Sequence, residues 1–138
     1  MKDEKCIFCK LANGEIPTNS IYEDEDFKVI LDADPATKGH ALILPKEHYA
    51  NLLEIDDVVA AKALPLAKKI AKNMMEKLGC VGINIVQNNG EAAGQTVHHF
   101  HVHVIPRYED DPDKTLCGWS HQSFSEEENK AVVESLKM

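Results

Sequence analysis

The sequence predicts an α+β domain in which an antiparallel five-stranded sheet packs against one long helix, followed by a C-terminal helix. Three observations indicate this class: short apolar segments bounded by turn residues, one long segment with helical periodicity, and no regular alternation of strands with helices. No Gly/Ser-rich or Pro-rich linker divides the 138 residues, so we expect a single domain over residues 1–138.

Five short segments are typical of strands, because each is largely apolar or alternating and is bounded by turn formers. The first two are separated by an acidic turn from Glu23 to Asp26, and the third ends at Pro45, since proline cannot donate to a strand ladder. A glycine-containing turn region precedes the last strand. The expected strands are two within 21–31 and one each in 40–45, 81–88 and the histidine-rich segment 98–107.

One long helix is expected over residues 56–78, because apolar residues recur at steps of three and four while lysines occupy the other face. Pro65 should kink this helix or mark a break near its first turns, and Gly79 should end it. A second helix should run from an N-cap at Ser125 to about Leu136, since three acidic residues follow the cap.

Charge and composition exclude several classes of function. The chain carries 15 Lys and Arg against 23 Asp and Glu, and the net charge of −8 argues against binding a nucleic acid polymer, which needs a basic surface. A single small nucleotide is not excluded. The charged start MKDEKC precedes no apolar segment, so neither a signal peptide nor a membrane span is expected. We therefore expect a cytoplasmic protein with reduced cysteines.

The segment HHFHVHVIPR holds four of the seven histidines of the chain. Successive strand residues point to opposite faces, so His99, His101 and His103 should share one face while the apolar residues between them pack on the core. A half-exposed strand, a zinc site and a catalytic site would each use such a pattern differently. One ion cannot take both outer histidines of a straight strand, since they lie roughly 13 Å apart and zinc–nitrogen bonds are about 2 Å. Catalysis uses all three, because neutral imidazole is a good nucleophile and its second nitrogen can be fixed by a hydrogen bond.

The longer segment GQTVHHFHVHVIPR resembles the signature of the histidine triad (HIT) family, in which three histidines alternate with apolar residues and two more apolar residues follow. The flanking residues match as well. The similarity extends back through DADPATKGHALILPKEHYANL to CIFCKLANGEIP, and so covers the chain from Cys6 to about Arg107. The resemblance implies the HIT fold, with its antiparallel sheet.

The resemblance also implies roles for individual residues. His101 would attack the α-phosphorus of a nucleotide to give a covalent nucleotidyl-histidine that water resolves, His103 would contact the phosphate and assist the leaving group, and His40 would lie beside the triad. Asp32 would take the ribose hydroxyls. The other candidates are Asn88, Gln95 and Thr96 around the phosphate and Phe8, Leu11, Ile30 and Ala33 along the base. Without the resemblance, these positions are also compatible with ordinary turn, strand-pairing or core residues.

Cys6 and Cys9 form a C-x-x-C pair, a spacing that occurs in zinc sites, in redox sites and without function. The redox interpretation requires a preceding strand, and residues 1–20 offer none. HIT-like chains with such a pair complete a tetrahedral zinc site with two histidines, here His48 and His99. The resemblance therefore implies zinc bound by Cys6, Cys9, His48 and the first triad histidine, which leaves the other two for chemistry.

The implied activity is cleavage of the α-phosphate linkage of a purine nucleoside monophosphate derivative, of the adenosine phosphoramidate type. A dinucleoside polyphosphate hydrolase is the alternative enzyme, because it shares the flanks of the triad. A non-catalytic nucleotide-sensing or protein-interaction module and a zinc-held adaptor are alternatives outside the enzymes. The resemblance further implies a homodimer paired through strand 82–88 and helix 56–78. The segment 108–122 departs from the short tails typical of the family and fits a lid, an arm toward a partner subunit or a disordered segment.

Overall fold

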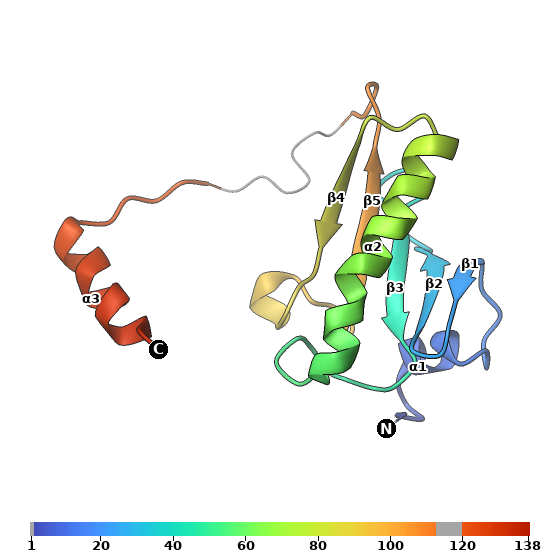
Figure 1. The fold of residues 1–138 in the computed structure, drawn as a ribbon, viewed down its shortest axis with the longest axis horizontal. Coiled ribbons are helices and arrows are strands. Elements are labelled where there is room, and N and C mark those ends of the chain that lie inside the picture. Colours follow the sequence, from blue (N-terminus) through green and yellow to red (C-terminus); the bar gives the residue numbers. More distant parts are fainter. Residues whose placement is uncertain (1, 113–119) are drawn as a thin grey trace.

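The computed structural model describes residues 2–112 and 120–138 of the chain, and it confirms the expected α+β class. Five antiparallel strands form one sheet in the order β1-β2-β3-β5-β4 (Figure 1). The strands are β1 (Ser20–Glu23), β2 (Phe27–Leu31), β3 (Ala41–Pro45), β4 (Gly82–Val86) and β5 (Val102–Arg107). The helices are α1 (Ile7–Ala12), α2 (Asp57–Lys77) and α3 (Glu126–Leu136), with a short 3-10 helix η1 (Glu91–Ala93).

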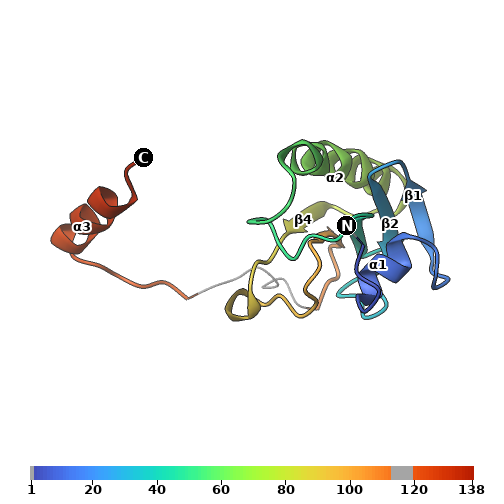
Figure 2. The same ribbon diagram turned by 90° about the horizontal axis from the view of Figure 1, so that it is seen from below.

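Helix α2 lies across one face of the sheet and α1 lies against the other (Figures 1 and 2). The carboxylate of Asp56 caps α2 by accepting the backbone N–H groups of Val58 and Val59. Pro65 lies inside α2, which continues through it, so of the two expectations for this residue, a kink or a break, the break does not occur. The carbonyl that Pro65 deprives of a donor belongs to Ala61, an exposed residue at which water can take over that bond.

The strands divide their side chains between two apolar layers. In β3, Ala41 and Ile43 belong to the main core beneath α2, whereas Leu42 and Leu44 belong to a smaller cluster beneath α1. This alternation is the period of two expected for a strand buried on both faces. The main core is formed by Phe27, Val29, Ala41, Ile43, Ile55, Ala63, Leu66, Ala67, Ile70, Met74, Cys80, Phe100, Val102 and Val104.

The histidine segment differs from the expected strand at its start. Strand β5 begins only at Val102, so His99 and His101 precede it. The backbone before the strand bonds elsewhere: the N–H of Phe100 donates to the carbonyl of Tyr49 at 2.6 Å instead of to a neighbouring strand. The alternation of faces nevertheless continues through the segment, because Phe100 joins Val102 in the main core.

Helix α1 was not expected from the sequence, because its six residues are too few to show a periodicity. Its N-cap is Cys6, whose sulfur accepts the backbone N–H of Cys9 at 3.3 Å. The short cap helix therefore places both cysteines of the C-x-x-C pair on the same turn.

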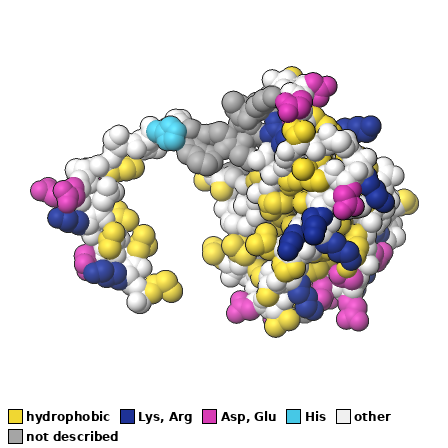
Figure 3. All heavy atoms as spheres, turned by 45° about the horizontal axis from the view of Figure 1, so that its top comes forward, with side chains coloured by type: hydrophobic (Ala, Val, Ile, Leu, Met, Phe, Trp, Pro, Cys, Tyr) yellow, Lys and Arg dark blue, Asp and Glu magenta, His cyan; other side chains and the backbone are white. Residues whose placement is uncertain are grey.

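Helix α3 begins as predicted, at a capping box formed by Ser125 and Glu128. Among the described residues it contacts no other helix or strand, and Figure 1 shows it apart from the sheet. In the space-filling view the same helix is separated from the main body of the molecule (Figure 3). Its larger apolar residues, Val132, Val133 and Leu136, are exposed. Part of the segment 108–122, for which a lid, an arm or disorder was considered, lies outside the described residues, as does Cys117. No helix in the described ranges is both long and apolar enough to cross a bilayer.

Candidate functional site

A cavity of about 440 Å³, termed the triad cavity, opens on the α1 side of the sheet. Eight of the residues expected at a nucleotide site line it: Phe8, Leu11, Ile30, Asp32, Ala33, Thr96, His101 and His103. Six others were not expected from the sequence: Pro17, Thr18, Leu31, Asp34, Leu42 and Val97. Most of the added residues are neighbours of expected ones or apolar strand residues facing α1, so the alternation along β2 and β3 was the signal that could have found some of them.

One nitrogen of His101 is fixed by the backbone. Its Nδ1 lies 2.7 Å from the carbonyl oxygen of His99, and because a carbonyl can only accept, Nδ1 carries the proton. The lone pair of the neutral ring is therefore on Nε2. Burial lowers the pKa of His101 below its ordinary value, which keeps the ring neutral near pH 7. The side chain of His101 thus offers a neutral nucleophilic nitrogen at the triad cavity.

A second chain of hydrogen bonds fixes His103. The backbone N–H of Ala36 donates to Nδ1 of His40 at 2.9 Å, so the proton of neutral His40 is on Nε2. That Nε2–H donates to Nδ1 of His103 at 2.9 Å, which leaves the remaining proton of His103 on its Nε2. We call this chain, Ala36 to His40 to His103, the histidine relay. It leaves His103 with an N–H group free to donate to a bound anion.

The carboxylate of Asp32 lies beside the histidine relay as well as in the triad cavity. Its Oδ2 is 3.4 Å from Nε2 of His40 and 4.0 Å from Nδ1 of His103, while its Oδ1 accepts the backbone N–H of Asp34 at 2.9 Å. Burial lowers the pKa of His103 to about 4, with the His101 and His40 rings adding to the effect and the Asp32 charge opposing it. Among the described residues, the Asp32 carboxylate is the negative group whose charge raises the pKa of the His40, His101 and His103 rings.

Four side chains gather beneath the triad in what we call the cysteine–histidine cluster: Cys6, Cys9, His48 and His99. Their ligand atoms all lie within 4.8 Å of one another. Nδ1 of His99 is 3.3 Å from Sγ of Cys6 and 3.4 Å from Sγ of Cys9, and Nδ1 of His48 is 3.4 Å from Sγ of Cys9. A tetrahedral zinc ion bound by sulfur and imidazole requires sulfur–nitrogen separations of about 3.5 Å. The cluster therefore has the donors and nearly the size for such an ion.

The surroundings of the cysteine–histidine cluster also suit a metal. Nε2–H of His99 donates to the carbonyl of Pro45 at 2.9 Å, which leaves the lone pair on the Nδ1 that faces the sulfur atoms. The backbone N–H of Asp3 donates to Sγ of Cys9 at 3.4 Å. Burial raises the pKa of the Cys9 thiol to about 11, and a bound dication would counteract this by favouring the thiolate.

Asp32, His40 and His103 form a second group with donor atoms close together, but it is poorly suited to a metal. The bond from Ala36 N–H occupies the Nδ1 lone pair of His40, so the Nε2 that faces the group carries a proton. A neutral imidazole ligates through an unprotonated nitrogen. The group is arranged to hold protons in place.

Two expected phosphate-side residues do not line the triad cavity. The Gln95 side chain is buried and bonds internally: its oxygen accepts the N–H of Gly90, and its nitrogen donates to the carbonyls of Ala50 and Val97. It braces the loop that carries Thr96. Asn88 is partly buried next to Gly94 and likewise lies outside the cavity lining.

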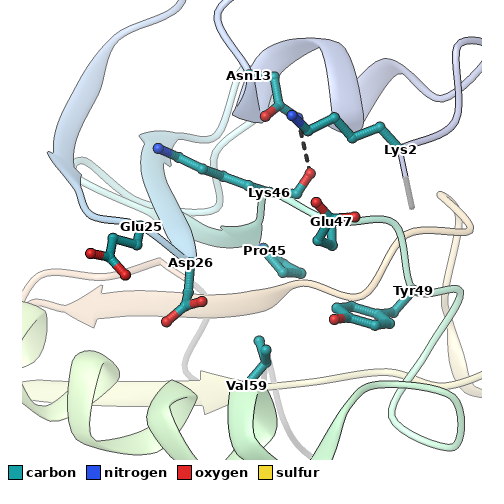
Figure 4. Close-up of a pocket in the computed structure, with 9 residues that line it drawn as sticks. All are labelled: Lys2, Asn13, Glu25, Asp26, Pro45, Lys46, Glu47, Tyr49 and Val59. Carbon is teal, nitrogen blue, oxygen red and sulfur yellow. Dashed lines mark hydrogen bonds between the residues drawn. The ribbon is translucent and has the colours of Figure 1, made fainter.

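A separate small cavity of about 120 Å³ lies between the residues that follow β3, the turn before β2 and the side chain of Val59 on α2 (Figure 4). Its charged residues are largely engaged with partners: Lys46 pairs with Glu23 at 2.7 Å, and Asp26 pairs with Lys62 at 2.8 Å. The amide of Asn13 crosses its edge to the carbonyl of Lys46 at 2.9 Å and ties the end of α1 to β3. No histidine or cysteine is among the residues that line this cavity. The nucleophilic imidazole groups instead line the triad cavity.

The sequence matches a known domain family and the sequences of known proteins. A model of the HIT domain matches residues 13–110, a range that contains Asp32, His40 and the triad but begins after the C-x-x-C pair. The adenosine 5'-monophosphoramidase hnt1 of Schizosaccharomyces pombe is 40% identical over 131 residues, covering 95% of this chain and 95% of that protein.

Two solved structures are similar over nearly the whole chain. A member of the HIT family from Bacillus subtilis has a TM-score of 0.86 at 38% identity and covers 96% of this chain and 95% of its own. A Zn-bound histidine triad family protein from Mycobacterium smegmatis has a TM-score of 0.75 at 35% identity and covers 96% of this chain and 98% of its own.

The depressed pKa of His103 gives a pH dependence of stability. The folded protein holds His103 neutral down to about pH 4, whereas an unfolded histidine takes up a proton near pH 6.5. The stabilisation is therefore present above about pH 6.5 and is lost as the pH falls toward 4. Urea titrations at about pH 7 and about pH 5 measure how far the free energy of unfolding falls on acidification. For His103→Gln this fall should be about 2 kcal/mol smaller than for the wild type, because glutamine does not titrate. His98→Gln, at an exposed histidine of the same segment, is the control and should keep the wild-type slope. Equal slopes in all three proteins would contradict the assignment.

Proposed function

The chain belongs to the histidine triad (HIT) family, and we propose that it is a nucleotide hydrolase that cleaves the α-phosphate linkage of a purine nucleoside monophosphate derivative of the adenosine phosphoramidate type. The observation that carries this proposal is the 2.7 Å bond from His101 Nδ1–H to the carbonyl of His99, which leaves Nε2 free as a nucleophile at the triad cavity. The S. pombe relative, whose name is that of an adenosine 5'-monophosphoramidase, supports the substrate class.

The triad cavity offers each part of such a substrate a suitable surface. Phe8 and Ile30 provide apolar walls for the flat base, and the Asp32 carboxylate can accept two hydroxyls of a ribose. His101 and His103 then lie at the α-phosphate, where the free N–H of His103 donates to a phosphate oxygen or to the leaving nitrogen. Gln95 supports this end of the cavity from behind through its bonds to the loop.

The proposed reaction has two steps. In the first, the lone pair of His101 Nε2 forms a bond to the α-phosphorus while the bond from phosphorus to the amine nitrogen breaks, and the amine leaves with that electron pair and one proton drawn from solvent. The Nδ1–H bond to the His99 carbonyl stabilises the positive ring that results. In the second, water attacks the phosphorus, His101 leaves as the neutral ring, and the proton released replaces the one taken by the amine. The sum consumes one water and gives a nucleoside monophosphate and an amine.

The cysteine–histidine cluster, we propose, holds one structural zinc ion through Cys6, Cys9, His48 and His99. Two sulfur and two imidazole donors form a closed tetrahedral set, which leaves no position for substrate. The Zn-bound relative from M. smegmatis supports the choice of metal. When bound, zinc contributes folding free energy at this site. A reducing compartment such as the cytoplasm keeps both cysteines available, and we place the protein there.

The protein is further proposed to be a homodimer. Among the described strands β4 pairs only with β5, so one of its edges is open, and Ile85 on β4 and Leu64 on α2 are exposed. An open strand edge beside exposed apolar side chains favours pairing with a second copy. We also propose that residues 1–138 form a single HIT domain.

The first prediction of the proposal concerns the nucleophile. With adenosine 5'-phosphoramidate as substrate, His101→Ala should lower kcat by at least about a thousandfold, because the covalent route is lost. The AMP dissociation constant should change little, since Asp32 and the apolar walls remain. Wild-type enzyme quenched and digested at alkaline pH, where a phosphorus–imidazole bond persists, should show a nucleotidyl adduct on His101 by mass spectrometry.

His98→Ala is the matched control, because His98 is an exposed neighbour outside the cavity lining and should keep wild-type turnover. Full activity of His101→Ala would end the proposed mechanism. Adduct formation with a dinucleoside polyphosphate but not with the phosphoramidate would instead assign the alternative substrate class.

A second prediction concerns zinc. Protein purified without chelator should contain about one zinc ion per chain by elemental mass spectrometry, and Cys9→Ser should lose it and unfold several degrees lower. Cys80→Ser serves as control, because Cys80 is a buried cysteine outside the cluster, and it should keep its zinc. A metal-free wild type with unchanged thermal stability would refute the assignment.

The assembly gives the third prediction. Light scattering at micromolar concentration should return twice the 15.4 kDa chain mass. Ile85→Lys should shift the protein toward the single-chain mass, because it places a charge at the open edge of β4. A wild type that runs as a single chain would contradict the dimer.

A further inference from the structure

Helix α1 depends on contacts at both ends, because six residues are too few for a helix that is stable alone. At its C-terminal end, the amide of Asn13 donates to the carbonyl of Cys9 at 2.8 Å. It also donates to the carbonyl of Lys46 at 2.9 Å (Figure 4). At its N-terminal end, Cys6 and Cys9 belong to the cysteine–histidine cluster. The interactions among the four side chains of the cluster, or with a metal bound between them, therefore set the position of this end of α1.

The residues between and after the two cysteines form a wall of the triad cavity. Phe8 lies inside the C-x-x-C pair and meets the His101 ring edge to face, with ring centroids 5.0 Å apart at 90°. It also contacts the His99 ring at 6.0 Å and 77°. Phe8 and Leu11 both line the cavity. A shift of α1 would thus move the base wall and the ring that packs against the nucleophile.

His99 makes the second connection between the cluster and the nucleophile. Its Nδ1 faces the two sulfur atoms, and its Nε2–H donates to Pro45. Its backbone carbonyl accepts the proton that selects the tautomer of His101. One residue therefore joins the metal donors to the group that orients the attacking nitrogen.

We infer that the cysteine–histidine cluster, with zinc bound, is a positioning device that couples metal binding to nucleotide binding, and that Phe8 is its positioning residue. This inference rests on the proposed function. Zinc fixes α1 and His99 together, Phe8 transmits the position of α1 to the cavity wall and the His101 ring, and the His99 carbonyl holds the His101 proton. Metal and nucleotide then stabilise the same arrangement of α1, although they occupy different places.

The test measures the coupling in both directions. Calorimetry gives the AMP dissociation constant of the zinc-loaded and the chelator-treated protein, and competition with a chromogenic chelator gives the zinc affinity with and without AMP. Zinc should tighten AMP binding by about fivefold or more, and AMP should tighten zinc binding by the same factor, because coupling free energies are reciprocal. Two factors near one would overturn the inference.

Two variants in the zinc-loaded protein separate coupling from general stability. Phe8→Ala removes the ring without removing a metal donor, so it should keep its zinc but lower the coupling factor toward one, and the connection through His99 accounts for any coupling that remains. Ile7→Ala, at an exposed neighbour on the same turn, should keep both its zinc and the wild-type coupling factor. Equal coupling in Phe8→Ala and in the wild type would remove Phe8 from the connection and overturn the assignment.

A spectroscopic measurement tests the same connection without any nucleotide. Long-range proton–nitrogen NMR of labelled protein should show the His101 ring with its proton on Nδ1 in the zinc-loaded wild type, and a mixture of tautomers in the chelator-treated wild type, because the metal no longer holds His99 and α1. A single unchanged tautomer in both would refute the inference. If AMP does not bind, the proposed function fails, while this comparison still decides whether α1 positions His101.

Discussion

The hydrogen bond between His101 Nδ1–H and the carbonyl oxygen of His99 is the interaction on which the site depends. It selects one of two tautomers of a neutral ring and so decides that the free lone pair is on the outer nitrogen. The carbonyl of His99 lies in the segment before β5, which starts at Val102, and it bonds to the His101 side chain two residues later. In the same segment, the backbone N–H of Phe100 donates to the carbonyl of Tyr49 instead of to a neighbouring strand. An irregular stretch of backbone before β5 therefore supplies the carbonyl that fixes the tautomer of His101.

Three of the described histidines, His40, His99 and His101, are buried and His103 is partly buried, and burial of imidazole is unfavourable unless each nitrogen has a partner. Here His40, His99 and His101 each bond to a backbone group, and His103 bonds to His40. Every buried side-chain nitrogen or oxygen in the described residues has a partner. The rings are held neutral and each presents a known nitrogen. Hydrogen bonds as well as packing therefore fix the orientation and the protonated nitrogen of each ring, and the partner of His101 is a backbone carbonyl, not a carboxylate.

The sequence was sufficient for the layers of the fold and for much of the site. Alternation predicted the five strands, helical periodicity predicted α2, and the period of two placed the triad opposite the apolar residues of its own segment. It did not predict α1, whose cap is a sulfur atom, or the start of β5 at Val102. The groups that fix the rings belong to the backbone, so the identity of the side chains does not reveal them. They are the N–H of Ala36 and the carbonyls of Pro45 and His99. Gln95 shows that a side chain can also be assigned the wrong contact. The sequence does not distinguish a polar side chain that contacts a phosphate from one that braces a loop.

The alternation from Phe100 to Val104 has one more consequence, which concerns length more than identity. Core and chemistry share this stretch, each using every second residue, so their placement depends on the count of residues between Val97 and Val104. Exchanging one apolar residue for another here changes packing by a methyl group or two. Inserting or deleting a single residue would send imidazoles beneath α2 and aliphatic groups toward the cavity at once. Point changes are therefore the only variation that this stretch can absorb gradually, whereas a change of length would remove stability and reactivity in a single event.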